Sequence, residues 1–251
     1  DFYFMRDSMD RLQALNLKEV KIKRNSEDLD DEIPVEAMAN KYSLLRIVLP
    51  DQLLKIKRSA FIGCKNLTGS LIIPEGVTYI GASAFDKCRA LTGTLVLPTT
   101  LEYIDGGDFA GNMGAFGGCG FTCELKLPEK LKHLGEWSFR ECNGLYGTLT
   151  LPDKLEFIGL GAFHECKNLS GSVKIPQKVV DIASGAFNGC VGLNGTLELH
   201  DGIASIGENA FKGTSLKGEL HLPKNLIALG ESAFDGCDFS GTLVLPEGLA
   251  S

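Results

Sequence analysis

The sequence predicts a solenoid, a domain built by stacking similar coils of about 24 residues, and three repeating observations predict it. Eight of the nine prolines each follow a short apolar run such as Leu71-Ile72-Ile73. About ten residues after most of these prolines, a small residue precedes Phe, as at Ala84-Phe85. Cys follows the Phe by three positions, and an apolar residue and Gly come next. Self-similarity at one fixed period is the signature of a repeat architecture.

The bulk composition excludes several classes of partner. The chain has 251 residues, 44% of them hydrophobic and 23% charged, which is ordinary for a globular protein. Its formal net charge of -7 argues against binding to nucleic acid or to anionic membrane surfaces. No apolar run approaches the roughly 18 residues that a membrane-spanning helix needs. Residues 1–5 also lack the basic start and apolar centre of a secretory signal. We therefore expect no nucleic-acid partner and no membrane insertion.

The first segment of each coil predicts a β-strand. Leu149, Thr150 and Leu151 alternate between apolar and polar, which is the period of a strand with one buried face. The proline that follows has no N–H to donate, so it ends the pairing. Because every coil repeats this segment, its strands are predicted to stack into a parallel sheet along the solenoid.

The second segment is ambiguous between a helix and an extended piece. Val77, Ile80 and Ala84 recur at helical spacing. However, Val, Thr, Tyr and Ile favour strands, and the Gly after Ile80 would weaken a helix interior by roughly 1 kcal/mol. We therefore predict a short extended piece, a Gly turn and about one helical turn around Ala-Phe-x-x-Cys, with one longer helix as the competing interpretation.

The Phe column and the Cys column are predicted to form the core. The phenylalanines that share one repeat position are Phe61, Phe85, Phe116, Phe139, Phe163, Phe187, Phe211 and Phe234. The cysteines that share another are Cys64, Cys88, Cys119, Cys142, Cys166, Cys190 and Cys237. Side chains stacked roughly 5 Å apart with parallel Cβ vectors suit a disulfide poorly, so we predict buried free thiols.

Catalytic and metal-binding motifs are not found in the sequence. Cys123 lies off the Cys column, four residues after Cys119, so a plain thiol, a local disulfide and a zinc site are the alternatives there. As a free thiol, Cys123 is expected to be the most reactive cysteine. His164 precedes Cys166 by two residues, but that cysteine belongs to the column. We expect no catalytic residues, no metal and no cofactor.

The chain divides into a cap and a solenoid. Residues 1–44 fit the repeat poorly and are predicted to form an N-terminal cap with a degenerate first coil, in which Ala37-Met38 takes the Ala-Phe place. Met9, Leu12, Leu15, Leu17, Val20 and Ile22 are expected to pack on the first coil. Residues 45–251 are predicted to form about eight coils, and the charged stretch 28–32 a solvated loop. The coil that starts at Leu95 has an insertion of about six residues within Asp105–Gly114.

One outward column carries aromatic or His side chains on four successive coils. These residues are Tyr79, Tyr103, His133 and Phe157. Exposed rings in a row suit stacking on sugars or anchoring a protein partner. The alternative is that the rings lie flat and cover the coil beneath them. The outward strand positions form a second column, predicted to be a concave binding face or a solvated sheet; they are Ile72, Val96, Lys126, Thr150, Lys174, Glu198, His221 and Val244.

The motif Leu-x-Leu-Pro-x-x-Leu-x-x-Ile-Gly-x-x-Ala-Phe-x-x-Cys-x-x-Leu-x-Gly closely resembles the BspA-like leucine-rich repeats, from about Leu44 onward. The resemblance implies a right-handed, curved leucine-rich-repeat solenoid, a cell-surface or secreted location, and adhesion to host proteins or other microbes. The family has no shared catalytic residues to carry over. The insertion within Asp105–Gly114 departs from the pattern and is a candidate for a binding feature of its own.

These observations predict a non-enzymatic recognition or adhesion module at the cell surface. Its expected partners are host or microbial surface proteins or glycans. The alternative is a structural spacer that presents another domain. Patterned outward columns favour the first interpretation, because residues at one repeat position align into an extended surface on a solenoid.

Overall fold

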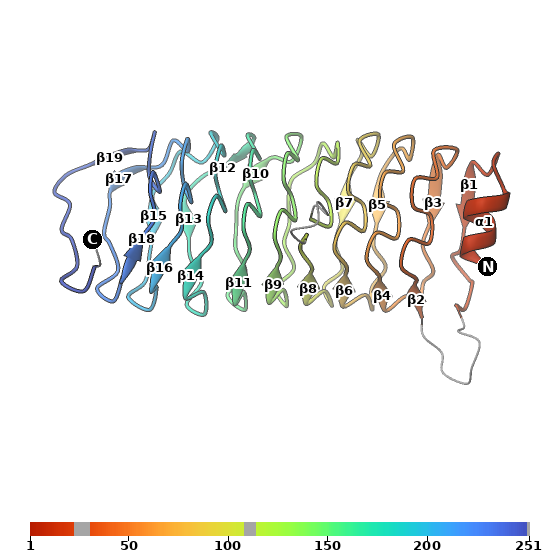
Figure 1. The fold of residues 1–251 in the computed structure, drawn as a ribbon, viewed down its shortest axis with the longest axis horizontal. Coiled ribbons are helices and arrows are strands. Elements are labelled where there is room, and N and C mark those ends of the chain that lie inside the picture. The colour runs from red at the N-terminus through yellow and green to blue at the C-terminus, as the bar shows by residue number, and fades with distance from the viewer. Residues whose placement is uncertain (23–30, 108–113, 250–251) are drawn as a thin grey trace.

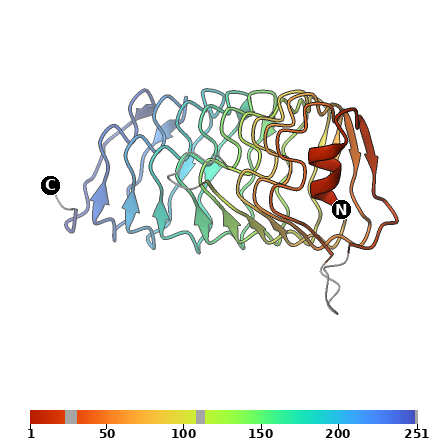
Figure 2. The same cartoon turned by 45° about the vertical axis from the view of Figure 1, so that its right-hand side comes forward.

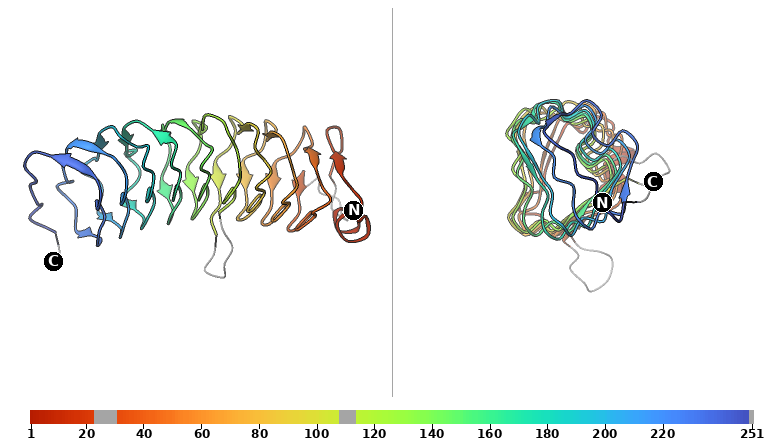
Figure 3. Two further views of the ribbon diagram at one scale, coloured as in Figure 1. Left: turned by 90° about the horizontal axis from the view of Figure 1, so that it is seen from above. Right: turned by 90° about the vertical axis from the view of Figure 1, so that its left-hand side faces the viewer.

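The computed structural model describes residues 1–22, 31–107 and 114–249, which form one elongated solenoid with the two ends of the chain far apart (Figure 1). Seen along its axis, the coils superimpose around one shared core (Figure 3). The predicted solenoid of about eight coils is confirmed. Most of the predicted loop at 28–32 and most of the insertion, residues 108–113, lie outside the described residues.

The first coil is covered by a short helix, α1 (Phe2–Ser8), which the sequence analysis did not predict (Figure 2). The Asp1 side chain caps it by accepting hydrogen bonds from the first amides of the helix. Arg6 Nη1 donates to the carbonyl of Glu36 at 2.8 Å, which ties the helix to the coil. A cap of this kind covers the open end of a stacked core.

The first strands already belong to the solenoid. β1 (Ala14–Asn16) pairs in parallel with β3 (Arg46–Val48). Ala37 and Met38 are fully buried, and the Met38 amide donates to the carbonyl of Ala60 at 2.7 Å, so this pair takes the predicted Ala-Phe place. The boundary of the cap at residue 44 stays a prediction.

The apolar residues near the N-terminus are only partly in the core. Leu15 and Leu17 are buried, as expected. Met9 and Val20 are exposed, so the prediction that they pack on the first coil is wrong. Leu15 lies at the inward position of β1, whereas Met9 and Val20 lie in the connections outside that strand.

The second segment of the coil forms the most continuous sheets. In spatial order, the six-stranded sheet contains β11 (Phe157–Ile158), β9 (His133–Leu134), β8 (Tyr103–Ile104), β6 (Tyr79–Ile80), β4 (Lys55–Ile56) and β2 (Glu32–Ile33). A three-stranded sheet follows, with β14 (Asp181–Ile182), β16 (Ser205–Ile206) and β18 (Ala228–Leu229). The first residue of each strand faces outward, and the second is buried in all of them except β18.

The first segment pairs only locally, which corrects the prediction of one sheet along the whole solenoid. β5 (Leu71–Ile72) pairs with β7 (Leu95–Val96), and β13 (Val173–Lys174) pairs with β15 (Leu197–Glu198). The Leu95 amide donates to Cys123 Sγ at 3.3 Å, so the sulfur atom takes the place of a carbonyl from the next coil. Two further pairs form at the adjoining turn: β10 (Gly147–Thr148) with β12 (Leu169–Ser170), and β17 (Lys217–Glu219) with β19 (Asp238–Ser240).

The Phe column runs through the core as a stack of rings. Neighbouring ring centroids are 5.1–5.8 Å apart and the rings are nearly parallel. Phe61 to Phe211 in this column are fully buried, as predicted. Phe234 is partly exposed, because no further coil packs on it within the described chain.

A tight turn, rather than a helix, holds each Phe. The Cys142 amide donates to the carbonyl of Phe139 at 3.1 Å, which closes a single turn. The Phe139 amide donates to the carbonyl of Ala162 in the next coil at 2.8 Å. The predicted turn is confirmed, and the competing long helix is absent from the coils that the structure describes.

The column thiols are bonded to the neighbouring coil. Cys142 Sγ, for example, lies 3.1 Å from the carbonyl oxygen of Phe116, one coil earlier, and the other column cysteines repeat this contact. All eight cysteines are free, Cys119 and Cys123 included. Cys123 is buried and Cys237 is half-buried, so the expectation that Cys123 is the most accessible thiol is wrong. Cys237 is more open because it lies in the last coil.

Candidate binding surface

The four predicted site residues form one row, which we call the aromatic strip: Tyr79, Tyr103, His133 and Phe157. They occupy the outward position of β6, β8, β9 and β11, which lie side by side in Figure 1. Each residue is the direct cross-strand partner of the next. The parallel register therefore brings together residues spread over 79 positions of the sequence, from 79 to 157.

Two rings of the strip, His133 and Phe157, stack on each other across neighbouring coils. His133 and Phe157 are stacked, with centroids 4.6 Å apart and planes at 8°. Tyr103 and His133 are tilted by 34° at 6.1 Å. The centroid separation of 4.6 Å is close to the strand spacing of about 4.8 Å and is too short for two rings that lie edge to edge, so the faces of these two rings overlap from one coil to the next. His133 and Phe157 therefore do not lie flat over the coil beneath them.

Exposure differs along the strip. Tyr103 is 42% exposed and Phe157 is 38% exposed. Tyr79 and His133 are half-buried. Tyr103 and Phe157 are therefore the accessible rings of the strip, and His133 is packed between them.

One border of the strip carries carboxylates. The Tyr79 hydroxyl donates to Asp105 Oδ2 at 2.6 Å, and burial together with this bond raises the pKa of Tyr79. Burial lowers the pKa of His133, although the carboxylates of Asp105 and Glu136 oppose that shift. At neutral pH the strip is therefore uncharged and lies beside negative charge.

The other border is electrically balanced. Lys132 Nζ lies 2.6 Å from Glu102 Oε2, and Lys178 Nζ lies 2.5 Å from Glu156 Oε1. Each ion pair joins neighbouring coils and holds the pKa of its Glu below the usual range. Asp105, on the opposite border, has no ion pair within the described part of the chain.

The sheet is interrupted directly after Phe157, at a break that we call the seam. β11 and β14 are neighbours in the stack, but within residues 1–22, 31–107 and 114–249 no backbone hydrogen bond joins them. On one side of the seam, the Gly159 amide donates to the carbonyl of Leu134 at 2.7 Å. On the other side, the Gly207 amide donates to the carbonyl of Ile182 at 2.7 Å. The equivalent amide at the seam belongs to Ala183.

Ala183 supplies a steric reason for the seam. A Cβ atom at Gly159 would lie 2.5 Å from the Glu136 nitrogen, and one at Gly207 would lie 2.4 Å from the Ser184 nitrogen. Ala183 occupies this position with a methyl group, so the two coils cannot approach in the same way. Two other coils carry a side chain here, Lys57 and Asp105, and keep their bond to the preceding coil, so we infer that the methyl group contributes to the seam without being its sole cause.

Phe157 has one ring face open toward the seam. His133 covers one face, so the other points along the axis toward β14. The outward residue of β14 is Asp181, which is exposed. The Ser205 hydroxyl donates to Asp181 Oδ1, and no ion pair to Asp181 occurs in the described residues. The strip thus ends in a ring face beside an uncompensated carboxylate.

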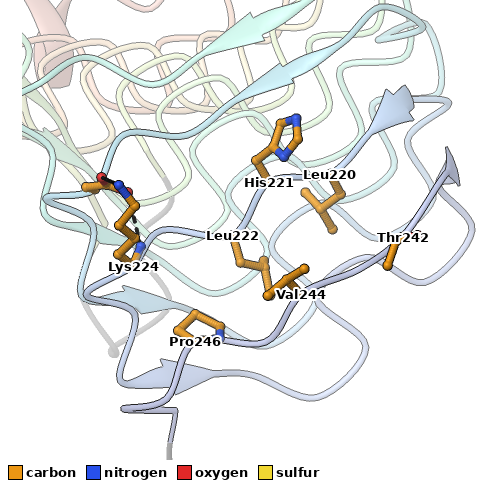
Figure 4. Close-up of a pocket in the computed structure, with 8 residues that line it drawn as sticks. Leu220, His221, Leu222, Lys224, Thr242, Val244 and Pro246 are labelled. Carbon is orange, nitrogen blue, oxygen red and sulfur yellow. Dashed lines mark hydrogen bonds and ion pairs between the residues drawn. The ribbon is translucent and has the colours of Figure 1, made fainter.

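The second outward column also faces solvent, and His221 is the one ring-bearing residue in it. Ile72 and Val96 are 64% and 43% exposed, on the face formed by the first segments. Farther along this face, a shallow hollow of about 320 Å³ lies between the last two coils. Figure 4 shows Leu222 and Val244 in it, beside Lys224. Lys224 Nζ is paired with Asp201 Oδ2 at 3.2 Å, so the hollow offers an apolar surface with a neutralised edge.

Trp137 is an aromatic residue that the sequence analysis did not single out. It has a φ of 57°, which is unusual for a bulky residue. A Cβ atom at Gly161 would lie 2.1 Å from its ring, and the Arg140 guanidinium carbon lies 5.5 Å from the ring centroid. His164 meets the ring edge-on. Trp137 is therefore packed among Gly161, Arg140 and His164. The glycine at position 161, in the next coil, is the feature of the sequence that could have indicated a bulky neighbour there.

Asp86 is a second residue that the sequence analysis did not single out. Its side chain is almost completely buried, with Lys87 Nζ 3.5 Å from Oδ2. Burial raises the pKa of Asp86, against the effect of the Lys87 ammonium. The repeat pattern did not mark this position, because the residue there varies from coil to coil and only Asp235 matches it.

Within residues 1–22, 31–107 and 114–249, no three His, Cys, Asp or Glu side chains are grouped to hold a metal ion. In the same ranges, no helix has the length and apolar character required to cross a bilayer.

Comparison with known proteins gives a family match. The family model described as "BspA type Leucine rich repeat region" matches in six copies, over residues 31–170 and 112–240. The comparison with curated proteins gives no significant match.

Comparison with solved structures gives several leucine-rich repeat proteins, of which the first shares the fold. A leucine-rich repeat protein from Bacteroides ovatus ATCC 8483 is 28% identical, with a TM-score of 0.68 over 87% of this chain and 53% of that one. The T. pallidum leucine-rich repeat protein is 24% identical, with a TM-score of 0.48 over 90% and 77%. A leucine rich cell surface protein from Faecalibacterium prausnitzii A2-165 is 21% identical, with a TM-score of 0.49 over 96% and 63%. The chain spans about half of the length of the Bacteroides ovatus protein.

Proposed function

Because the chain belongs to the family of proteins with a BspA-type leucine-rich repeat region, we propose that it is a non-catalytic recognition module that binds a polypeptide through the aromatic strip. The observation that carries this proposal is the row of two exposed rings, Tyr103 and Phe157, held in register by the sheet. Rigid rings at fixed spacing lose little conformational entropy when they are covered, which suits them to anchor an interface.

A polypeptide fits the strip better than a sugar does. Stacking on a sugar uses the face of a ring, and the His133 ring is flanked by Tyr103 and Phe157. The exposed ring edges instead suit apolar and polar side chains that pack across the row of rings. The ion pairs and carboxylates on the two borders add the polar rim that protein interfaces carry.

We place the module on a cell surface or in secreted form, with host or microbial surface proteins as partners. The support is the resemblance of its repeats to those of bacterial surface proteins. The solenoid fits this role because each repeat position supplies one aligned row of side chains.

The proposal is tested with a double variant, Tyr103→Ala with Phe157→Ala. Wild type and variant are applied to arrays of peptides and of glycans, and each ligand found is titrated. Anchor residues of an interface each cost roughly 2 kcal/mol or more when truncated, so the double variant should lose a micromolar interaction. Its melting temperature should stay close to that of wild type, because both side chains are exposed.

The matched control removes two exposed apolar side chains from the other face, as Ile72→Ala with Val96→Ala. This control should bind as wild type does. Equal binding by wild type and the strip variant would reject the strip as the site. Absence of any ligand would favour the alternative, a structural spacer.

A further inference from the structure

We propose that the seam beside Phe157 is a socket for an arginine side chain of the bound polypeptide. This inference rests on the proposed function, because it names the chemistry that the end of the strip recognises. The elements that form the socket are the open face of Phe157, the carboxylate of Asp181 and the unpaired backbone between β11 and β14.

The ring face is the first element. The Phe157 ring is stacked on His133 at 4.6 Å, so its free face looks across the seam. The next two outward residues, Asp181 and Ser205, carry no ring. Among the described residues, the ring contact of Phe157 is with His133, and the cations that lie over rings belong to other aromatic residues. A planar cation placed there would gain cation–π attraction and apolar contact together.

The carboxylate is the second element. Asp181 lies at the outward position of β14, directly past Phe157 in the stack. Ser205 donates to Oδ1, which leaves Oδ2 without a partner in the described chain. Lys178 also spans the seam, but Glu156 neutralises it at 2.5 Å. The charge left at this end of the strip is therefore negative.

The interrupted ladder is the third element. The Lys132 carbonyl accepts from the amides of Glu156 and Phe157 at 2.8 and 3.2 Å. The Glu156 carbonyl holds the same place one coil later, and within the described residues it accepts no backbone bond. Glu156, the exposed residue directly before β11, thus presents a carbonyl acceptor without a backbone donor in the described residues, next to a ring and a carboxylate.

These three elements together select arginine. Its guanidinium is planar, so it stacks on a ring, and it carries five donors in a fixed fork that can serve a carboxylate and a carbonyl at once. A lysine ammonium offers the charge without the flat face. A neutral sugar or an acidic peptide offers no charge for Asp181. The partner is therefore a polypeptide that presents an exposed arginine next to apolar residues.

The experiment uses a random dodecapeptide library displayed on phage, selected on the full chain. Selected peptides are synthesised, and each arginine is replaced in turn by lysine and by citrulline, which is flat but uncharged. We expect arginine in the selected peptides and a loss of about tenfold or more with citrulline at one position. The lysine peptide should bind with an intermediate affinity, because it keeps the charge and loses the planar contact.

Variants of the chain separate this proposal from the proposed function. Asp181→Asn and Phe157→Leu should each weaken the arginine peptide by about tenfold and should remove the difference between arginine and citrulline. The matched control is Asp153→Asn, which removes an exposed carboxylate from the coil of Phe157. It should leave the affinity for the arginine peptide unchanged. Peptides that need Tyr103 and Phe157 but bind equally with arginine and citrulline would overturn the socket and leave the strip standing. If the affinity of the selected peptides is the same for wild type and for every strip variant, both the arginine socket and the aromatic strip as the binding site are overturned.

Discussion

Two faces of the same pair of coils behave differently. On the inner side, the coils at residues 149–172 and 173–196 are joined without interruption: the Phe163 amide donates to the Ala186 carbonyl at 2.8 Å, and the rings of Phe163 and Phe187 stack at 5.6 Å. On the outer sheet, the same coils share no backbone bond in the described chain. The difference shows that the core, and not the sheet, holds the coils together.

The reason lies in what each side buries. The Phe and Cys columns remove large apolar surface from water in every coil, which is the dominant favourable contribution to folding. The outer strands are two residues long, and the first residue of each is open to solvent, so a missing backbone bond there can be replaced by bonds to water at little cost. A surface sheet of this kind can therefore be interrupted where a partner binds, while the fold stays intact.

The sharpest test compares two phenylalanines of one coil, Phe163→Ala and Phe157→Ala. Phe163 is fully buried between two rings, so its truncation should lower the free energy of unfolding by about 3–5 kcal/mol. Phe157 is 38% exposed, so its truncation should cost under about 1 kcal/mol. Urea denaturation followed by circular dichroism measures both. Similar losses would mean that the outer sheet is as important for stability as the core.

A second test creates another seam with Gly159→Ala. The new methyl carbon would lie 2.5 Å from the Glu136 nitrogen, so β11 should shift away from β9 and the backbone bonds between them should weaken. Overpacking of this kind typically costs about 1–3 kcal/mol. Urea denaturation gives the loss, and hydrogen exchange should show faster exchange at the amides of Glu156 and Phe157. An unchanged exchange pattern would contradict the steric account of the seam.

A third test uses the thiols of the inner side and the pH. Burial raises the pKa of Cys142 and of Cys190 to about 12, whereas an unfolded thiol has a pKa of about 8.5. The folded state thus keeps protons that the unfolded state releases, so this stability is present below about pH 8.5 and is lost as the pH rises toward 12. At about pH 9.5, each such thiol should reduce the free energy of unfolding by about 1.4 kcal/mol relative to pH 7.

The measurement is urea denaturation of wild type and of Cys142→Ala at both pH values. The free energy of unfolding of Cys142→Ala should be lower than that of wild type at both pH values. Its decrease between pH 7 and about pH 9.5 should, however, be smaller than that of wild type by about 1.4 kcal/mol. A thiol reagent applied to the native protein should modify the half-buried Cys237 first. Rapid labelling of Cys142 would contradict the packed column.

Much of the fold follows from the repeat in the sequence. Because Phe139 and Cys142 recur at fixed positions, their burial could be predicted without any structure. The alignment of Tyr103 with His133 followed from the same register. The length of the sheet formed by the first segments was overestimated. The repeat pattern cannot show that the Leu95 amide bonds to Cys123 Sγ instead of to a backbone carbonyl, which interrupts the pairing of the strands.

The seam could not be predicted from the pattern either. Ala183 in place of glycine is visible in the sequence, but its consequence depends on the distance between two backbones, which only coordinates supply. The stacking of His133 on Phe157 is likewise a matter of rotamers. Residues that depart from the repeat are therefore where sequence reasoning is weakest and where the candidate site lies.

The finest test closes the seam with Ala183→Gly. Removing the methyl group should let β14 approach β11 and form the missing backbone bonds, each worth about 0.5–1.5 kcal/mol. Glycine loses more conformational freedom on folding, which costs roughly 0.5–1 kcal/mol, so the net change in stability should stay within about 1 kcal/mol. Hydrogen exchange is therefore the informative measurement. In wild type, the amides of Asp181 and Ala183 should exchange faster than that of Gly207, which is bonded to Ile182. In the variant they should become protected, and the arginine peptide should bind more weakly because the Glu156 carbonyl is occupied. Protection of Asp181 and Ala183 already in wild type would show that the seam is closed in solution.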